Sequence, residues 1–131
     1  MNREEPDPMP AYVKLLVADT ARSAGFYELL GFTVVHRDPV FTHLRWAPQA
    51  DLFLVATPPG MSLPGPHGVG VIVCFHATGD VALETIAARA VSAGAMVDGP
   101  REQPWHTREV LVTDLDGYRV SFVEPSAALL G

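Results

Sequence analysis

Histidine and cysteine are among the side chains in this sequence that could bind a transition metal or move a proton. The chain has five histidines and one cysteine: His36, His43, His67, His76, His106 and Cys74. No two histidines have the H-x-H or H-x-x-x-H spacing that brings two imidazoles to one metal, and they fall on different expected elements. A site could still be built from His43, His76 and His106 if the fold gathers them, and a general base among them would need an orienting partner.

The single cysteine excludes an internal disulfide and a cysteine-rich zinc site. Cys74 lies in the apolar run VGVIVCF, which favours a buried and inert thiol over a reactive one.

Large aromatic side chains suit the binding of an organic molecule. Four of them could line one groove and stack on planar or cationic ligands: Tyr12, Trp46, Phe53 and Trp105. The alternative for each tryptophan is ordinary packing in the core or in a subunit contact.

Strand alternation indicates which polar residues accompany them. His76 shares the alternation of Ile72 and Cys74, so the three should face one side, and His106 directly follows Trp105. Each of the two histidines is either a ligand contact or an ordinary hydrogen-bonded residue.

Four polar residues of the second module, two on each of two expected strands, are considered next for the side of the sheet that they face. Arg119 and Ser121 share one face by the same alternation. Arg108 and Glu109 are most simply a solvated strand edge or an ion pair.

Composition bounds the partners. Hydrophobic residues make up 48% of the 131 residues and charged residues 18%, enough for one domain with a real core. The net charge of −6 disfavours nucleic acid. No apolar run approaches the roughly 18–20 residues of a membrane span, and the N-terminus MNREEPDPMP does not resemble a signal peptide. We therefore expect a cytoplasmic protein with no membrane or nucleic-acid partner.

An internal repeat organises these residues. Asp19 and Asp80 each precede a helix-like stretch, and Gly31 and Gly94 each end one. The two Asp are 61 residues apart and the two Gly 63. Each Asp is expected to cap its helix and each Gly to supply the left-handed residue after it.

Strand-like segments broken by turn residues follow each helix, at 32–36, 40–46 and 51–56 and again at 95–98, 107–113 and 118–124. The pattern predicts an α+β fold of two tandem βαβββ modules, forming a cupped mixed sheet with helices on the outer face. We expect one domain over 1–131: an N-terminal arm at 1–10, modules at 11–57 and 69–125, a Pro/Gly-rich linker at 58–68, and a tail at 126–131.

Three stretches resemble the vicinal-oxygen-chelate superfamily, which includes glyoxalases, bleomycin-resistance proteins and extradiol dioxygenases. The first is DTARSAGFYELLGF, from Asp19 to Phe32. The second is AGA, from Ala93 to Ala95, with Pro104-Trp105 and Arg108-Glu109 after it. The third is DLDGYRVSFVEP, from Asp114 to Pro125. Together they extend from residue 19 to residue 125.

The resemblance implies a position for each of the superfamily's four metal ligands, one on each of four strands. The positions match Tyr12, Phe53, Ile72 and Ser121. Two of these side chains are apolar, and the four together cannot make a divalent-metal site. We therefore expect neither metal nor cofactor.

The resemblance to the metal-free members implies a homodimer that binds and sequesters a small molecule, such as an antibiotic, which is aromatic or cationic. Its expected contacts are Tyr12, Trp46, Phe53, Ile72, His76, Trp105, His106 and Ser121. The alternative is a glyoxalase- or dioxygenase-like enzyme whose displaced metal is held by histidines, and a third possibility is a structural or regulatory module.

Overall fold

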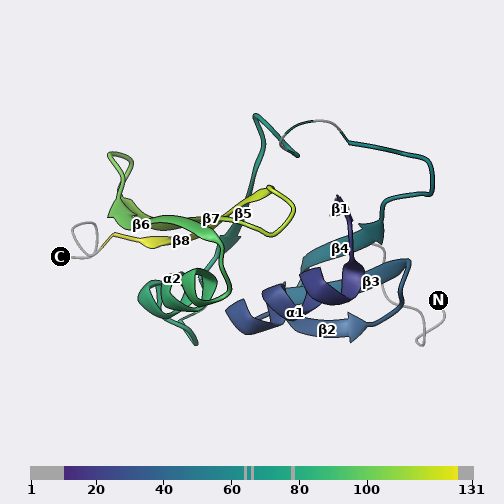
Figure 1. Cartoon of the computed structure of the whole chain (residues 1–131). Helices are drawn as coiled ribbons and strands as arrows, with labels where there is room; N and C mark the ends of the chain where they lie inside the picture. The colour runs from purple at the N-terminus through teal and green to yellow at the C-terminus, as the bar shows by residue number, and fades with distance from the viewer. Residues whose placement is uncertain (1–10, 64, 66, 78, 127–131) are drawn as a thin grey trace.

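The computed structural model describes residues 11–63, 65, 67–77 and 79–126. The first module contains β1 (Val13–Val17), α1 (Thr20–Leu30), β2 (Thr33–His36), β3 (Phe41–Ala47) and β4 (Ala50–Ala56). The second contains β5 (Ile72–His76), α2 (Leu83–Ser92), β6 (Met96–Glu102), β7 (Thr107–Thr113) and β8 (Arg119–Pro125). The strand–helix–three-strand repeat predicted from the sequence is confirmed (Figure 1).

Each module forms its own four-stranded mixed sheet. The strand order is β1-β4-β3-β2 in the first and β5-β8-β7-β6 in the second. β1 pairs with β4 and β5 with β8 in parallel, while the other pairs are antiparallel. The α+β class and the two-module arrangement are therefore as expected, with the strands divided between two sheets.

One face of each sheet is covered by the helix of its module. Leu15 and Leu54 are buried on the α1 side of the first sheet, and Val110 and Phe122 on the α2 side of the second. Successive strand residues point to opposite faces, so their neighbours in sequence point away from the helix. Burying each such apolar side chain contributes roughly 1.5–3 kcal/mol, which fixes this orientation.

Aromatic rings join the two modules into one core. Phe32 from the first module packs edge-on against Phe75 from the second, with centroids 5.1 Å apart. Trp46 lies 5.0 Å from Phe122, and its Nε1 donates a 2.6 Å hydrogen bond to the His76 carbonyl. Most contacts of Trp46 are therefore ordinary core packing, the alternative considered for it from the sequence.

The β7–β8 turn also reaches across to the first module. The Asp116 carboxylate accepts hydrogen bonds from the Ala18 amide (3.0 Å) and the Ser23 hydroxyl (2.9 Å). The Tyr27 hydroxyl donates to Asp114 at 2.5 Å, and the Tyr118 hydroxyl donates to the Leu16 carbonyl at 2.8 Å. These four contacts attach the second module to β1 and α1.

The two helices begin differently. Asp19 is the N-cap of α1 and accepts from the Arg22 amide at 3.1 Å, as expected. The expectation for Asp80 is wrong, because α2 begins at Leu83 and its N-cap is Ala82, which has no capping side chain. Gly94 has a φ of +88° directly after the α2 C-cap, the left-handed position predicted for it.

Two strands differ in length from the sequence prediction. β5 starts at Ile72, three residues after the expected start of the second module at Val69, because Gly68 and Gly70 both have positive φ and the chain turns there. β6 continues to Glu102 through an irregularity between Asp98 and Arg101, beyond the expected end at residue 98.

The expected N-terminal arm and residues 127–131 of the expected tail lie outside the described residues. None of the helices that the structure describes has the length and apolar character needed to cross a membrane.

Candidate functional site

We call the sheet face turned away from its helix the open face of that module. The first open face carries Lys14, His43, Asp51 and Phe53, by strand alternation and pairing register. The second carries Ile72, Cys74, Glu109, Leu111 and Ser121, which line one small cavity. The predicted alternation of Ile72, Cys74 and His76, and that of Arg119 with Ser121, agrees with this register.

An aromatic cluster centred on Phe53 occupies the first open face. The Phe53 ring stacks on His43 with centroids 4.4 Å apart, and Tyr12 and Phe41 lie 5.1 and 5.2 Å from it. Phe53 is buried, while Tyr12 is 54% exposed. The cluster therefore presents Tyr12 to solvent and has Phe53 as its base.

An ion cluster around the buried Asp51 side chain lies beside these rings. The Arg45 guanidinium donates to both oxygens of Asp51, at 2.8 and 2.9 Å, and His43 Nε2 is 2.6 Å from Asp51 Oδ2. The Asp51 side chain is fully buried. Hydrogen bonding from Arg45 holds the pKa of Asp51 below its usual range; burial opposes this and His43 adds to it. Asp51 thereby orients the His43 ring.

Glu109 is the central polar group of the second open face. Its Oε2 accepts from the Thr107 hydroxyl at 2.7 Å and the Trp105 indole at 2.9 Å, and its Oε1 lies 3.4 Å from the Ser121 hydroxyl. The Thr107 hydrogen bond is the main influence holding the pKa of Glu109 below its usual range. Burial opposes it, and Trp105 and Ser121 add to it.

The expectation that Arg108 and Glu109 form a solvated strand edge or an ion pair is wrong, because β7 is an inner strand and the two side chains do not pair. Arg108 pairs instead with Glu84 and Glu124. The signal that could have identified Glu109 is its alternation with Val110 and Val112, which are buried against α2.

The cavity beside Glu109 has a volume of about 220 Å³. Its floor contains Ile72, Cys74 and Leu111, and Trp105 stands at its side, 62% exposed. Cys74 is exposed, so the expectation of a buried thiol is wrong. Partial desolvation of the thiol and, secondly, the charge of Glu109 raise the pKa of Cys74.

A bulge in β6 shapes the edge of this cavity. Gly99 has a φ of +103°, and a Cβ built on it would lie 2.6 Å from the Glu109 carbonyl oxygen. Only glycine lets β6 approach β7 this closely while Asp98 and Arg101 stand at the cavity edge. Those two residues pair with each other at 2.5 Å.

A larger groove of about 530 Å³ lies between the modules. Its lining includes Tyr12, Trp46, Asp51, Cys74 and His76. It runs from Tyr12 and Asp51 on the first open face to β5 of the second module.

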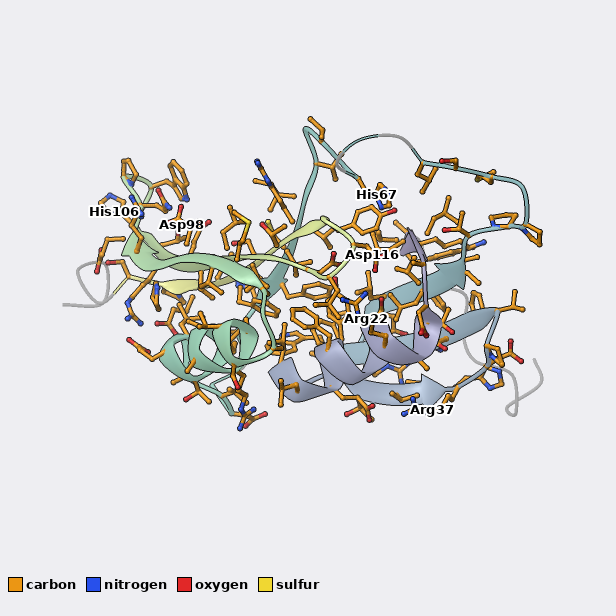
Figure 2. All side chains as sticks on the ribbon, viewed as in Figure 1. Arg22, Arg37, His67, Asp98, His106 and Asp116 are labelled. Atoms are coloured by element: carbon orange, nitrogen blue, oxygen red, sulfur yellow. The ribbon has the colours of Figure 1, made fainter. Side chains whose placement is uncertain are left out.

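The residues predicted to line one groove thus fall into four places, although Tyr12, Trp46 and His76 all line the groove between the modules. Tyr12 and Phe53 are together on the first open face, and Ile72, Trp105 and Ser121 are together around the small cavity. Trp46 and His76 meet at the module junction. His106, with a φ of +67°, lies in the turn before β7 at the far end of the second module, away from Asp116 at the junction (Figure 2).

The sequence and the fold are similar to those of known proteins. The family model of the glyoxalase/bleomycin resistance protein/dioxygenase superfamily matches residues 10–122. The chain belongs to this superfamily. No curated protein sequence matches it.

Solved structures similar to this superfamily member support the fold. A bleomycin-binding protein complexed with bleomycin is 23% identical, with a TM-score of 0.65 over 88% of this chain and 98% of the other. The bleomycin resistance determinant of transposon Tn5 is 24% identical, with a TM-score of 0.65 over 88% and 96%. TnmS3, an antibiotic binding protein from Streptomyces sp. CB03234, is 22% identical, with a TM-score of 0.66 over 93% and 100%.

The metal site that the superfamily implies does not fit the side chains present. The matching positions are divided between the first open face (Tyr12, Phe53) and the second (Ile72, Ser121), and offer two hydroxyls and two apolar groups. Divalent metals in such sites take imidazole and carboxylate ligands. Among the residues that the structure describes, no group of three His, Cys, Asp or Glu side chains could hold a metal ion.

Proposed function

We propose that this protein binds a small organic molecule on its open faces without a metal ion and sequesters it. The observation that carries the proposal is the replacement at the superfamily's ligand positions, where Phe53 and Ile72 offer apolar surface instead of metal donors. Concave sites with apolar and aromatic walls and a few fixed polar groups are typical of ligand pockets.

We further propose that the complete site forms between two copies of the chain. Each open face exposes large apolar groups, among them Tyr12 and Ile72, at 54% and 50% exposure. A two-fold dimer can place the first open face of one copy against the second open face of the other, making two equal grooves.

The similar structures suggest the first ligands to test. Bleomycin and other antibiotics are suitable probes because two of those proteins are described as bleomycin-binding and antibiotic binding. The alternative, an enzyme with a metal held by displaced histidines, gains no support from the placement of His43, His76 and His106 on separate elements.

A ligand panel read out by thermal shift and tryptophan fluorescence tests the proposal. A ligand at 100 times its Kd should raise the free energy of unfolding by about 2.7 kcal/mol. Tyr12→Ala and Trp105→Ala, both at exposed positions, should weaken binding of any hit at least about tenfold. Val91→Ala, at an exposed position of α2, is the control and should leave affinity unchanged.

Two results would contradict the proposal. One is a hit whose affinity neither open-face variant changes. The other is stoichiometric iron, manganese, nickel or zinc that stays with the purified protein through dialysis. Sedimentation analysis tests the dimer separately. A protein that stays monomeric at all concentrations would contradict the proposal that the complete site forms between two copies.

A further inference from the structure

Each open face has a central carboxylate, Asp51 on the first and Glu109 on the second, and among the described residues only Asp51 is paired with a cation. Asp51 is bonded to the cationic Arg45 and to His43. Of the residues that the structure describes, those that donate to Glu109 are all neutral, namely one indole N–H and two hydroxyls. Within the described ranges, the arginines closest to it in sequence are engaged elsewhere: Arg108 with Glu84 and Glu124, and Arg101 with Asp98.

Neutral donors hold a carboxylate in place without cancelling its charge. They favour the ionised form, so the pKa of Glu109 falls. The charge remains and acts on the cavity, because it contributes to raising the pKa of the Cys74 thiol on the cavity floor. Glu109 is therefore a fixed negative charge without a partner cation among the described residues.

The two oxygens of Glu109 differ in what they can still accept. Oε2 already receives two short hydrogen bonds, from Thr107 and Trp105. Oε1 receives one long contact, at 3.4 Å from Ser121. A guanidinium fork needs both oxygens, so the arrangement favours a cation that donates to Oε1 alone.

The dimensions of the cavity limit what fits beside that oxygen. Its volume of about 220 Å³ is below the roughly 300–1,000 Å³ of a pocket for a whole drug-sized ligand. It suits a head group whose carbon skeleton contacts Ile72 and Leu111. The exposed Trp105 ring adds a surface that attracts cations.

We propose that Glu109 binds the protonated amine of the ligand, a primary or secondary ammonium that donates to Oε1 beside the Trp105 ring. This inference rests on the proposed function, and it specifies the chemical class of one end of the ligand. It also assigns roles to Thr107 and Ser121, which position the carboxylate.

Benzylamine and benzyl alcohol form a matched pair of probes, because they share shape and differ in charge at the group facing Glu109. We expect benzylamine to bind about tenfold to a hundredfold more tightly, the range for a hydrogen bond to a charged group. Benzamidine, with a forked cation, and benzyltrimethylammonium, without an N–H, should bind more weakly than benzylamine. Affinity is measured by fluorescence, and protection of Cys74 from a maleimide locates the probe.

Glu109→Gln tests the residue itself. Its carbonyl can still accept from Thr107 and Trp105, while its amide N–H₂ faces the probe and cannot accept from an ammonium. We expect benzylamine affinity to fall at least about tenfold and benzyl alcohol affinity to stay within about twofold. Glu124→Gln removes the same charge on the α2 side of β8 and should change neither affinity.

Two outcomes would overturn the inference. Equal affinity for benzylamine and benzyl alcohol would do so while leaving small-molecule binding intact, whereas failure of every ligand in the broader panel concerns the proposed function. The second outcome is that Glu109→Gln and Lys14→Met weaken dimer formation equally, while Glu109→Gln does not change the preference for benzylamine over benzyl alcohol. Glu109 would then pair with Lys14 of a second copy and not with a ligand.

Discussion

At the level of single residues, Asp51 contributes to stability through its two basic partners. Its side chain is fully buried and bonded to Arg45 and His43, and its pKa is lowered, chiefly by the hydrogen bond from Arg45. A lowered carboxyl pKa adds stability above the unfolded value of about 3.9, and this stability is lost as pH falls through the folded pKa.

We therefore predict that Asp51→Asn loses about 1–3 kcal/mol at pH 7, because it leaves Arg45 and His43 without their anion. The difference from the wild-type protein should shrink below about pH 4. Urea denaturation at pH 7 and pH 3 measures this. Glu28→Gln, which breaks the exposed pair with Arg37, should change stability little at either pH. A loss equal at both pH values would mean that packing, not charge, is what Asp51 contributes.

At the level of elements, the two helices show how far a repeat in sequence specifies a repeat in structure. A glycine with positive φ follows each helix, as expected: Gly31 is the C-cap of α1, and Gly94 comes directly after the C-cap of α2. The N-termini differ because the N-cap is the last extended residue before the first turn. That residue is Ala82, with φ −68° and ψ 149°, and not Asp80. Matching Asp residues at equivalent spacing could not predict this shift of two positions.

The uncapped start of α2 gives a stabilising prediction. Ala82 is exposed and already has extended N-cap geometry, so Ala82→Ser adds a hydroxyl that can accept from the first-turn amides. We expect a gain of about 0.5–1 kcal/mol, seen as a rise of about 2–4 °C in Tm. Asp19→Ala, which removes the α1 cap, should shift Tm down by a similar amount. No gain in Ala82→Ser would show that these amides already have partners.

At the level of the whole molecule, the Tyr27–Asp114 hydrogen bond joins α1 to the β7–β8 turn. Burial raises the pKa of Asp114, and the bond from Tyr27 opposes that rise. A raised carboxyl pKa costs stability as pH increases past the unfolded value, and the Tyr27 hydroxyl reduces this cost.

Tyr27→Phe should therefore destabilise the protein by about 1–3 kcal/mol at pH 7 and by less at pH 4. Tyr118→Phe is the matched control, because that hydroxyl donates to a neutral carbonyl, Leu16. Its loss should be similar at both pH values. Denaturant titrations at the two pH values make the comparison, and the same pH dependence in both variants would contradict this role of Asp114.

The molecule also shows which part of the candidate site the sequence could predict. Alternation along β5 and β8 correctly grouped Ile72 with Cys74 and Arg119 with Ser121. It could not predict that Tyr12 and Trp105 belong to different open faces, because their separation depends on how the modules pack through Phe32 and its partners. Glu109 was missed for a local reason: it follows Arg108, and the adjacent opposite charges suggested a pair.

The aromatic contacts between the modules and the contacts of the β7–β8 turn make the covalent link between the modules less important for their association. They hold the modules together without the linker, whose residues 58–62 are exposed. The linker then acts chiefly by keeping one half at high effective concentration near the other, in the millimolar range for a short flexible tether. Cutting the backbone there should leave a split protein whose halves stay associated and continue to behave as one particle.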